Sequence, residues 1–158
     1  MRRAVIILSG LAALCATLPA IGQNTRFGVE PPRTAGQIQP DPVVGLSDVM
    51  ILKQWRHIKL WYAAKSDNWD LVNYELQGIA SSLNRAAVHY VNIPVDYVVA
   101  ATKTISDMRE AAAARDHARF NRGYGELTTA CNSCHAAGGV GFIRIQTPTA
   151  SPFSDQSY

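Results

Sequence analysis

The feature that most constrains the fold is the helical patterning of residues 46–137. Apolar side chains recur there every three or four positions, the spacing that places them on one face of an α-helix. Alternating apolar and polar residues, which are typical of a half-buried strand, occur only in the short segment 142–146. The sequence therefore predicts an all-α fold over most of the chain.

Residues that favour helix ends divide this region into four predicted helices. Short polar residues are good N-caps and proline suits a first turn, so the helices should begin near Ser47, Asn68, Pro94 and Asp116. The second helix should end before residue 92, since Pro94 disfavours helical geometry just before it, and Gly138 with Gly139 should end the fourth. Four helices joined by short connections predict an antiparallel four-helix bundle.

The pentapeptide Cys131-Asn132-Ser133-Cys134-His135 lies at the end of the fourth predicted helix. Cys-x-x-Cys-His is the signature at which a c-type haem is attached. Its spacing lets the thiols of Cys131 and Cys134 bond the two vinyl groups of one porphyrin, and the adjacent His135 then supplies the proximal iron ligand. The motif predicts one covalently bound haem c held by these three residues.

Two other uses of a Cys-x-x-Cys pair agree less well with the sequence. A zinc site needs about four ligands, but the remaining cysteine, Cys15, lies near the N-terminus, and His57, His89 and His117 are not paired at ligand spacing. A redox dithiol is expected at the start of a helix that follows a strand, whereas this pair comes at the end of a predicted helix. The haem interpretation is therefore favoured.

The N-terminus has the three parts of a secretory signal peptide. Arg2 and Arg3 precede an apolar run, and small residues near position 22 offer a cleavage site. Residues 1–22 are predicted to be removed on export to the periplasm, and residues 23–45, with four prolines, to form an extended lead-in. Without the two arginines the net charge falls from +3 to about +1, and no basic patch points to nucleic acid.

Two residues of the first predicted helix are candidates for a sixth iron ligand. In an antiparallel bundle the start of this helix faces the end of the fourth, which places Met50 and His57 on the side of the motif. They lie about 20° apart around the helix but about 10.5 Å apart along it, so only one can reach the iron. Met50 gives a His/Met iron, His57 gives a bis-His iron, and an iron without a sixth protein ligand is the third alternative.

With this motif and these helices, the chain resembles the class II c-type cytochromes, the cytochrome c-prime group. Cys131, Cys134 and His135 match the attachment motif of that family, and Met50 approximately matches the sixth ligand of its low-spin members. The resemblance implies a four-helix bundle over residues 46–137 and leaves room for a homodimer, since four-helix cytochromes often dimerise through their first two helices. The chain departs from the family in residues 138–158, which we expect to form an extended tail packed on the bundle.

A single haem, without a recognisable acid–base pair in the sequence, points to the Fe(III)/Fe(II) couple as the chemistry. The leading interpretation is a periplasmic mono-haem cytochrome that carries single electrons between redox partner proteins and is not an enzyme. The alternative is a five-coordinate haem protein that binds nitric oxide or carbon monoxide. A weaker third interpretation is a haem subunit of a periplasmic oxidoreductase.

Overall fold

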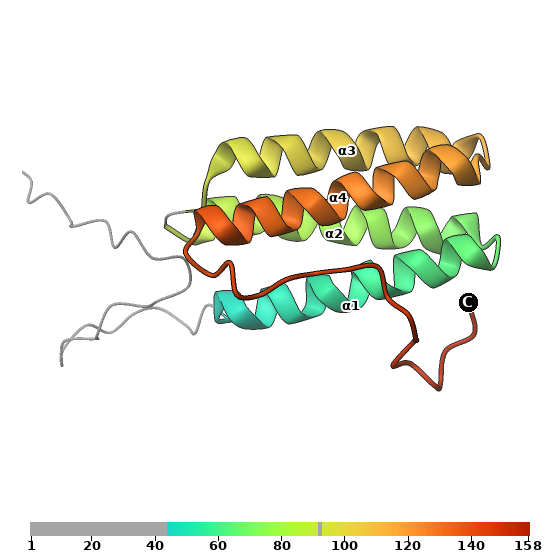
Figure 1. Cartoon of the computed structure of the whole chain (residues 1–158), viewed down its shortest axis with the longest axis horizontal. Helices are drawn as coiled ribbons and strands as arrows, with labels where there is room; N and C mark the ends of the chain where they lie inside the picture. The colour runs from blue at the N-terminus through green and yellow to red at the C-terminus, as the bar shows by residue number, and fades with distance from the viewer. Residues whose placement is uncertain (1–43, 92) are drawn as a thin grey trace, which may run out of the picture.

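A computed structural model describes residues 44–91 and 93–158, which form four helices and contain no strand (Figure 1). The helices are α1 (Leu46–Lys65), α2 (Trp69–His89), α3 (Val95–Ala113) and α4 (His117–Ala137). The all-helical prediction is confirmed for this part of the chain. The predicted signal peptide (1–22) and nearly all of the predicted lead-in (23–45) lie outside the described residues. No described helix is both long enough and apolar enough to cross a membrane.

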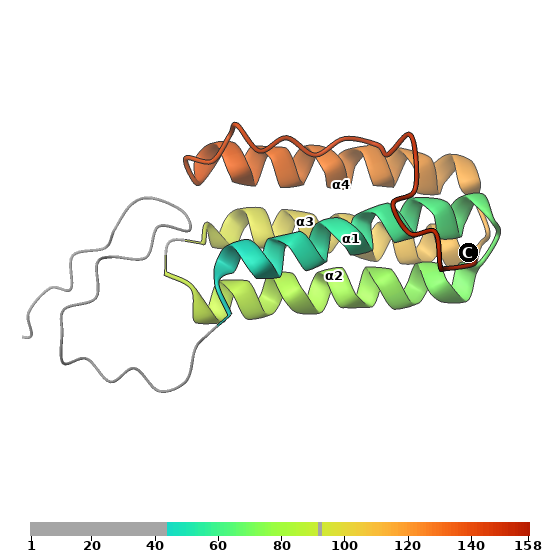
Figure 2. The same cartoon turned by 90° about the horizontal axis from the view of Figure 1, so that it is seen from below.

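The helices lie side by side with alternating direction (Figures 1 and 2). Close packing joins α1 to α2, α2 to α3 and α3 to α4. The connections α1–α2 and α3–α4 lie at one end of the bundle, which we call the closed end. The start of α1, the α2–α3 connection and the end of α4 lie at the opposite end, which we call the open end.

Side-chain capping explains two of the four helix starts. The side chain of Asn68 accepts a hydrogen bond from the Leu71 amide at the start of α2, and Asp116 does the same for Arg119 at the start of α4. The first helix differs from the prediction, because it begins at Leu46 after Gly45 and has no side-chain cap, so Ser47 lies inside it. Leu46 is only 8% exposed, so burial of its side chain extends the helix past the predicted cap.

The apolar core is divided between the two ends of the bundle. The larger cluster reaches the closed end and includes the fully buried side chains of Leu60, Leu76, Ile105, Phe120 and Tyr124. A smaller cluster at the open end is formed by Leu46, Ala86, Ile93 and Val98. The fourth helix passes along both clusters, so the motif at its end is carried on a well-packed element.

Residues 138–158, the C-terminal tail, contain no helix and run back along the side of the bundle where α1 and α4 face each other (Figures 1 and 2). Near its start the tail contacts α4, where the side chain of Asn132 hydrogen-bonds the backbone of Ile145. Further along it contacts α1, where Phe153 packs edge-on against Trp55 with ring centres 6.1 Å apart. The tail thus bridges α1 and α4, whose backbones are not closely packed against each other.

Candidate functional site

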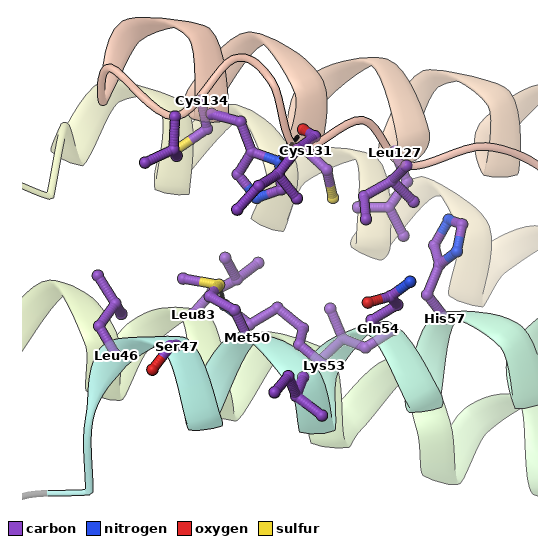
Figure 3. A pocket seen from close by; sticks show the side chains of 16 residues that line it. Leu46, Ser47, Met50, Lys53, Gln54, His57, Leu83, Leu127, Cys131 and Cys134 are labelled. Atoms are coloured by element: carbon purple, nitrogen blue, oxygen red, sulfur yellow. Dashed lines mark hydrogen bonds between the residues drawn. The ribbon is translucent and has the colours of Figure 1, made fainter. Parts of the chain in front are cut away.

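A cavity of about 380 Å³ lies at the open end between α1, α4 and the tail (Figure 3). Its volume falls within the range of about 300–1,000 Å³ typical of small-molecule and cofactor sites. Most of the side chains around it are apolar, and they come from all three segments and from α2. The cavity brings together Met50 and His57 from α1 with Cys131, Cys134 and His135 from α4.

Cys131 and Cys134 lie one turn apart at the end of α4, and both line the cavity as free cysteines. Burial raises the pKa of Cys131 to about 11 and also raises that of Cys134, with a partial offset from the nearby Lys53 ammonium. Catalytic redox thiols have lowered pKa values, often from a helix N-terminus. The environment of this pair instead keeps both thiols protonated, on the wall of an apolar cavity.

The ring of His135 is oriented by the tail. Its Nδ1 lies 2.9 Å from the carbonyl oxygen of Ile143. Because a carbonyl only accepts hydrogen bonds, Nδ1 is the protonated nitrogen and the lone pair of the neutral ring is on Nε2. This is the tautomer that a histidine needs in order to bind a metal through Nε2, with its other nitrogen held by a backbone carbonyl.

Met50 lies on the α1 wall of the same cavity (Figure 3). It packs at the edge of the open-end cluster, which also contacts Cys134 and Val140. Its sulfur accepts a hydrogen bond from Nζ of Lys53 at 3.4 Å. The structure therefore brings the predicted thioether ligand and the attachment motif to one cavity, on opposite helices.

His57 also borders the cavity, but its ring is hydrogen-bonded to α4. Nε2 lies 2.9 Å from Oγ1 of Thr128, and Nδ1 lies 2.8 Å from the hydroxyl of Tyr124. Because the Thr128 hydroxyl donates to the carbonyl of Tyr124, Nε2 of the neutral His57 ring donates to Thr128, and Nδ1 shares the hydroxyl proton of Tyr124 with the carbonyl of His57. Burial lowers the pKa of His57 to about 4, which favours this neutral form.

Lys53 is a residue of the cavity that the sequence reasoning missed. Its side chain is only 7% exposed, and burial lowers its pKa to about 8 although the two cysteines partly oppose the shift. The signal was present in the sequence, as one inward face of α1 carries Leu46, Met50, Lys53, His57 and Leu60 at three- and four-residue spacing. A lysine and a histidine within such an apolar stripe indicate polar groups that face the interior.

Within residues 44–91 and 93–158, no group of three or more His, Cys, Asp or Glu side chains is arranged to hold a metal ion. The site consists of two thiols, two imidazoles and one thioether around an apolar cavity, with a buried amine beside them. No protein-family model matches the chain, and neither a curated protein nor a solved structure matches it significantly.

Proposed function

We propose that this protein is a periplasmic mono-haem c-type cytochrome of the four-helix kind, which carries single electrons. Cys131 and Cys134 would hold one haem through thioether bonds, and His135 would bind its iron. The observation that carries the proposal is that both thiols and the ring of His135 line one apolar cavity, with the lone pair of His135 on Nε2. The haem supplies the Fe(III)/Fe(II) couple when bound.

The residues around the cavity agree with the needs of such a group. The apolar side chains from α1, α2 and the tail exclude water from the macrocycle, and a dry environment is one of the factors that set a reduction potential. The raised pKa of Cys131 speaks against a thiolate that attacks disulfides. These observations support covalent haem over a redox dithiol.

For the sixth ligand we propose Met50. Its sulfur borders the cavity opposite α4, whereas both ring nitrogens of His57 already have hydrogen-bond partners. Binding of His57 to iron would break the hydrogen bond at the nitrogen that bound it, and the hydroxyl of Tyr124 or Thr128 would keep only a backbone carbonyl as its partner. Losing one such hydrogen bond costs about 0.5–1.5 kcal/mol.

One contact favours a second candidate function, the binding of a small gas. The hydrogen bond from Lys53 engages one of the two lone pairs of the Met50 sulfur, which makes the sulfur a weaker electron donor toward iron. A sulfur that keeps this partner leaves the sixth position open to nitric oxide or carbon monoxide, within an apolar cavity. Electron transfer and gas binding therefore differ in whether the Met50 sulfur binds the iron or keeps its hydrogen bond with Lys53.

Absorption spectra of the purified protein separate these functions. An electron carrier ligated by Met50 should show sharp, split α and β bands on reduction, the long-wavelength band of Met–Fe(III) ligation, and no change with carbon monoxide. Met50→Ala should abolish that band and create carbon monoxide binding, while Leu52→Ala, a change at an exposed residue of α1 that does not line the cavity, should do neither. A wild-type spectrum that shifts with carbon monoxide and is unchanged in Met50→Ala would instead support gas binding.

Two further measurements test the haem and its location. Intact mass should show one haem per chain, and Cys131→Ser with Cys134→Ser should remove it. A mature N-terminus at Gln23 in the periplasmic fraction would support the predicted signal peptide. A wild-type protein with no covalent haem would contradict the proposed function.

A further inference from the structure

We propose that the C-terminal tail positions the proximal histidine, with the carbonyl of Ile143 orienting the His135 ring and Asn132 holding the tail in register. This inference rests on the proposed function, because it assigns a role toward the haem iron. It adds positioning residues that lie outside the Cys-Cys-His set, one of them between the two cysteines. Four features of the structure support it.

The first feature is the turn that brings the tail back beside α4. The Gly139 amide donates to the carbonyl of Ala136 and the Val140 amide to that of His135, and Gly139 has a positive φ of 76°. These two bonds form a Schellman motif, which needs a residue that tolerates left-handed geometry. Helix α4 therefore ends in a reversal that directs the tail back toward His135.

The second feature is the close approach after this turn. A side chain at Gly141 would come within 3.3 Å of Cα of Ala136, tighter than an ordinary contact. The Ile143 amide donates to the carbonyl of Val140 at 2.9 Å, which turns the chain again. The carbonyl of Ile143 is thereby placed 2.9 Å from Nδ1 of His135.

The third feature is the pairing of Asn132 with Ile145. Nδ2 of Asn132 donates to the Ile145 carbonyl at 2.8 Å, and Oδ1 accepts from the Ile145 amide at 2.7 Å. One side-chain amide thus satisfies both backbone groups of one residue, which requires a donor and an acceptor in the same side chain. Since Asn132 is three residues before His135, this pairing fixes which tail carbonyl faces the histidine ring.

The fourth feature is the attachment of the far part of the tail to α1. The ring of Phe153 contacts Trp55 and lies 4.7 Å from Nζ of Lys59, while Tyr158 packs on Tyr62 with ring centres 5.5 Å apart. These contacts attach the tail to α1 beyond the cavity, so that the tail is held by both helices. The orientation of His135 is therefore coupled to α1 as well as to α4.

A carbonyl that accepts from Nδ1 has two effects on a metal-binding histidine. It restricts rotation of the ring, and it makes Nε2 a stronger electron donor. A stronger donor stabilises Fe(III) relative to Fe(II), so loss of the hydrogen bond should raise the midpoint potential. It should also expose the Nδ1 proton to exchange with water.

The test compares Asn132→Ala with Ser133→Ala in the full-length haem protein. Both positions lie between the cysteines, but Ser133 is exposed and makes no contact that the argument uses. The readouts are the exchange rate of the hyperfine-shifted Nδ1 proton of His135, measured by NMR, and the midpoint potential. Because Asn132→Ala loses both hydrogen bonds to Ile145, the Nδ1 proton of His135 should exchange roughly tenfold faster and the midpoint potential should be higher, while Ser133→Ala matches the wild type.

A second pair of variants tests the turn without altering the motif. Gly139→Val cannot adopt the positive φ without strain, whereas asparagine tolerates it. Gly139→Val should reproduce the faster exchange and higher potential, and Gly139→Asn should not. This pair keeps the proposal testable if Asn132→Ala accumulates poorly.

Failure of this inference is distinguishable from failure of the proposed function. Covalent haem in every variant, with exchange rates and potentials equal to those of the wild type, would overturn the role of the tail and leave the cytochrome proposal standing. Rapid exchange of the Nδ1 proton in the wild type itself would also overturn the role of the tail. Absence of covalent haem from the wild type would overturn both.

Discussion

The closed and open ends of the bundle bring α1 and α4 together in different ways. Toward the closed end the two helices meet directly, since His57 hydrogen-bonds both Tyr124 and Thr128 and the Tyr124 hydroxyl also lies 3.0 Å from the carbonyl of His57. All three side chains are at most 9% exposed. This end is a packed core with its polar groups paired.

At the open end the same two helices border a cavity instead of each other. The half-buried thiols of Cys131 and Cys134, the sulfur of Met50 and the buried amine of Lys53 surround it, and the tail covers one side. The difference teaches that α1 and α4 are packed against each other without a ligand on the closed side, whereas at the open end they leave a cavity that the proposed haem would fill.

The largest expected effect follows from leaving the open end without that group. Cys131→Ala with Cys134→Ala should prevent covalent attachment, and the protein should then be poorly folded or degraded, because a cofactor-sized apolar surface is missing from the core. Near-UV circular dichroism and thermal unfolding measure the effect. A variant without haem that melts cooperatively near the wild-type temperature would show that the open end folds unaided.

A smaller effect is expected from adding a side chain to the tightly packed closed end. A Cβ at Gly123 would lie 2.6 Å from Cγ of the buried Met108, whereas at Gly125, two residues away on α4, it would meet nothing within 4 Å. Gly123→Ala should lower the free energy of unfolding by about 1–3 kcal/mol through overpacking. Gly125→Ala should raise it by roughly 0.5–1 kcal/mol through helix propensity. Denaturant unfolding of both variants measures the two changes in the free energy of unfolding. Equal changes at Gly123 and Gly125 would contradict the prediction.

The smallest expected effect is a pH dependence at His57, where the packed part of the bundle meets the cavity. Burial lowers the pKa of His57 from 6.5 to about 4, so the unfolded chain binds a proton that the folded chain does not. The contribution of His57 to stability is complete above about pH 6.5 and is lost as the pH falls toward about 4. Between pH 7.5 and 5.5 it should fall by about 1 kcal/mol.

The corresponding measurement is denaturant unfolding at these two pH values. His57→Gln should lose this part of the pH dependence, even though it changes the stability at pH 7.5. If the free energy of unfolding of His57→Gln fell with pH as steeply as that of the wild type, other titrating groups would be responsible. That result would weaken the contrast between the packed part of the bundle and the cavity.

Local features made much of the fold predictable from the sequence. The caps at Asn68 and Asp116 and the end of α4 at Gly138 depend on neighbouring residues alone, and each lies where the sequence placed it. The start of α1 was placed wrongly, because it is decided by burial of Leu46 against distant parts of the chain.

The candidate site was predictable to a lesser degree. The Cys-x-x-Cys-His spacing singled out three residues of α4 that line the cavity, and helix geometry placed Met50 on the side of α1 that faces it. The inward position of Lys53 was missed because lysine is usually an exposed residue. The pairing of Asn132 with Ile145 joins residues 13 apart through a turn, and no periodic pattern encodes such a contact.

The position of the tail after the motif has a consequence for the order of assembly. A chain is synthesised from its N-terminus, so Cys131 and Cys134 emerge before Ile143 and well before Phe153. On the proposed function, the pentapeptide would be accessible to attachment machinery during that interval, before the partner of the His135 ring has arrived. Maturation would then have a built-in sequence of events, in which a segment made after the motif closes over the finished centre.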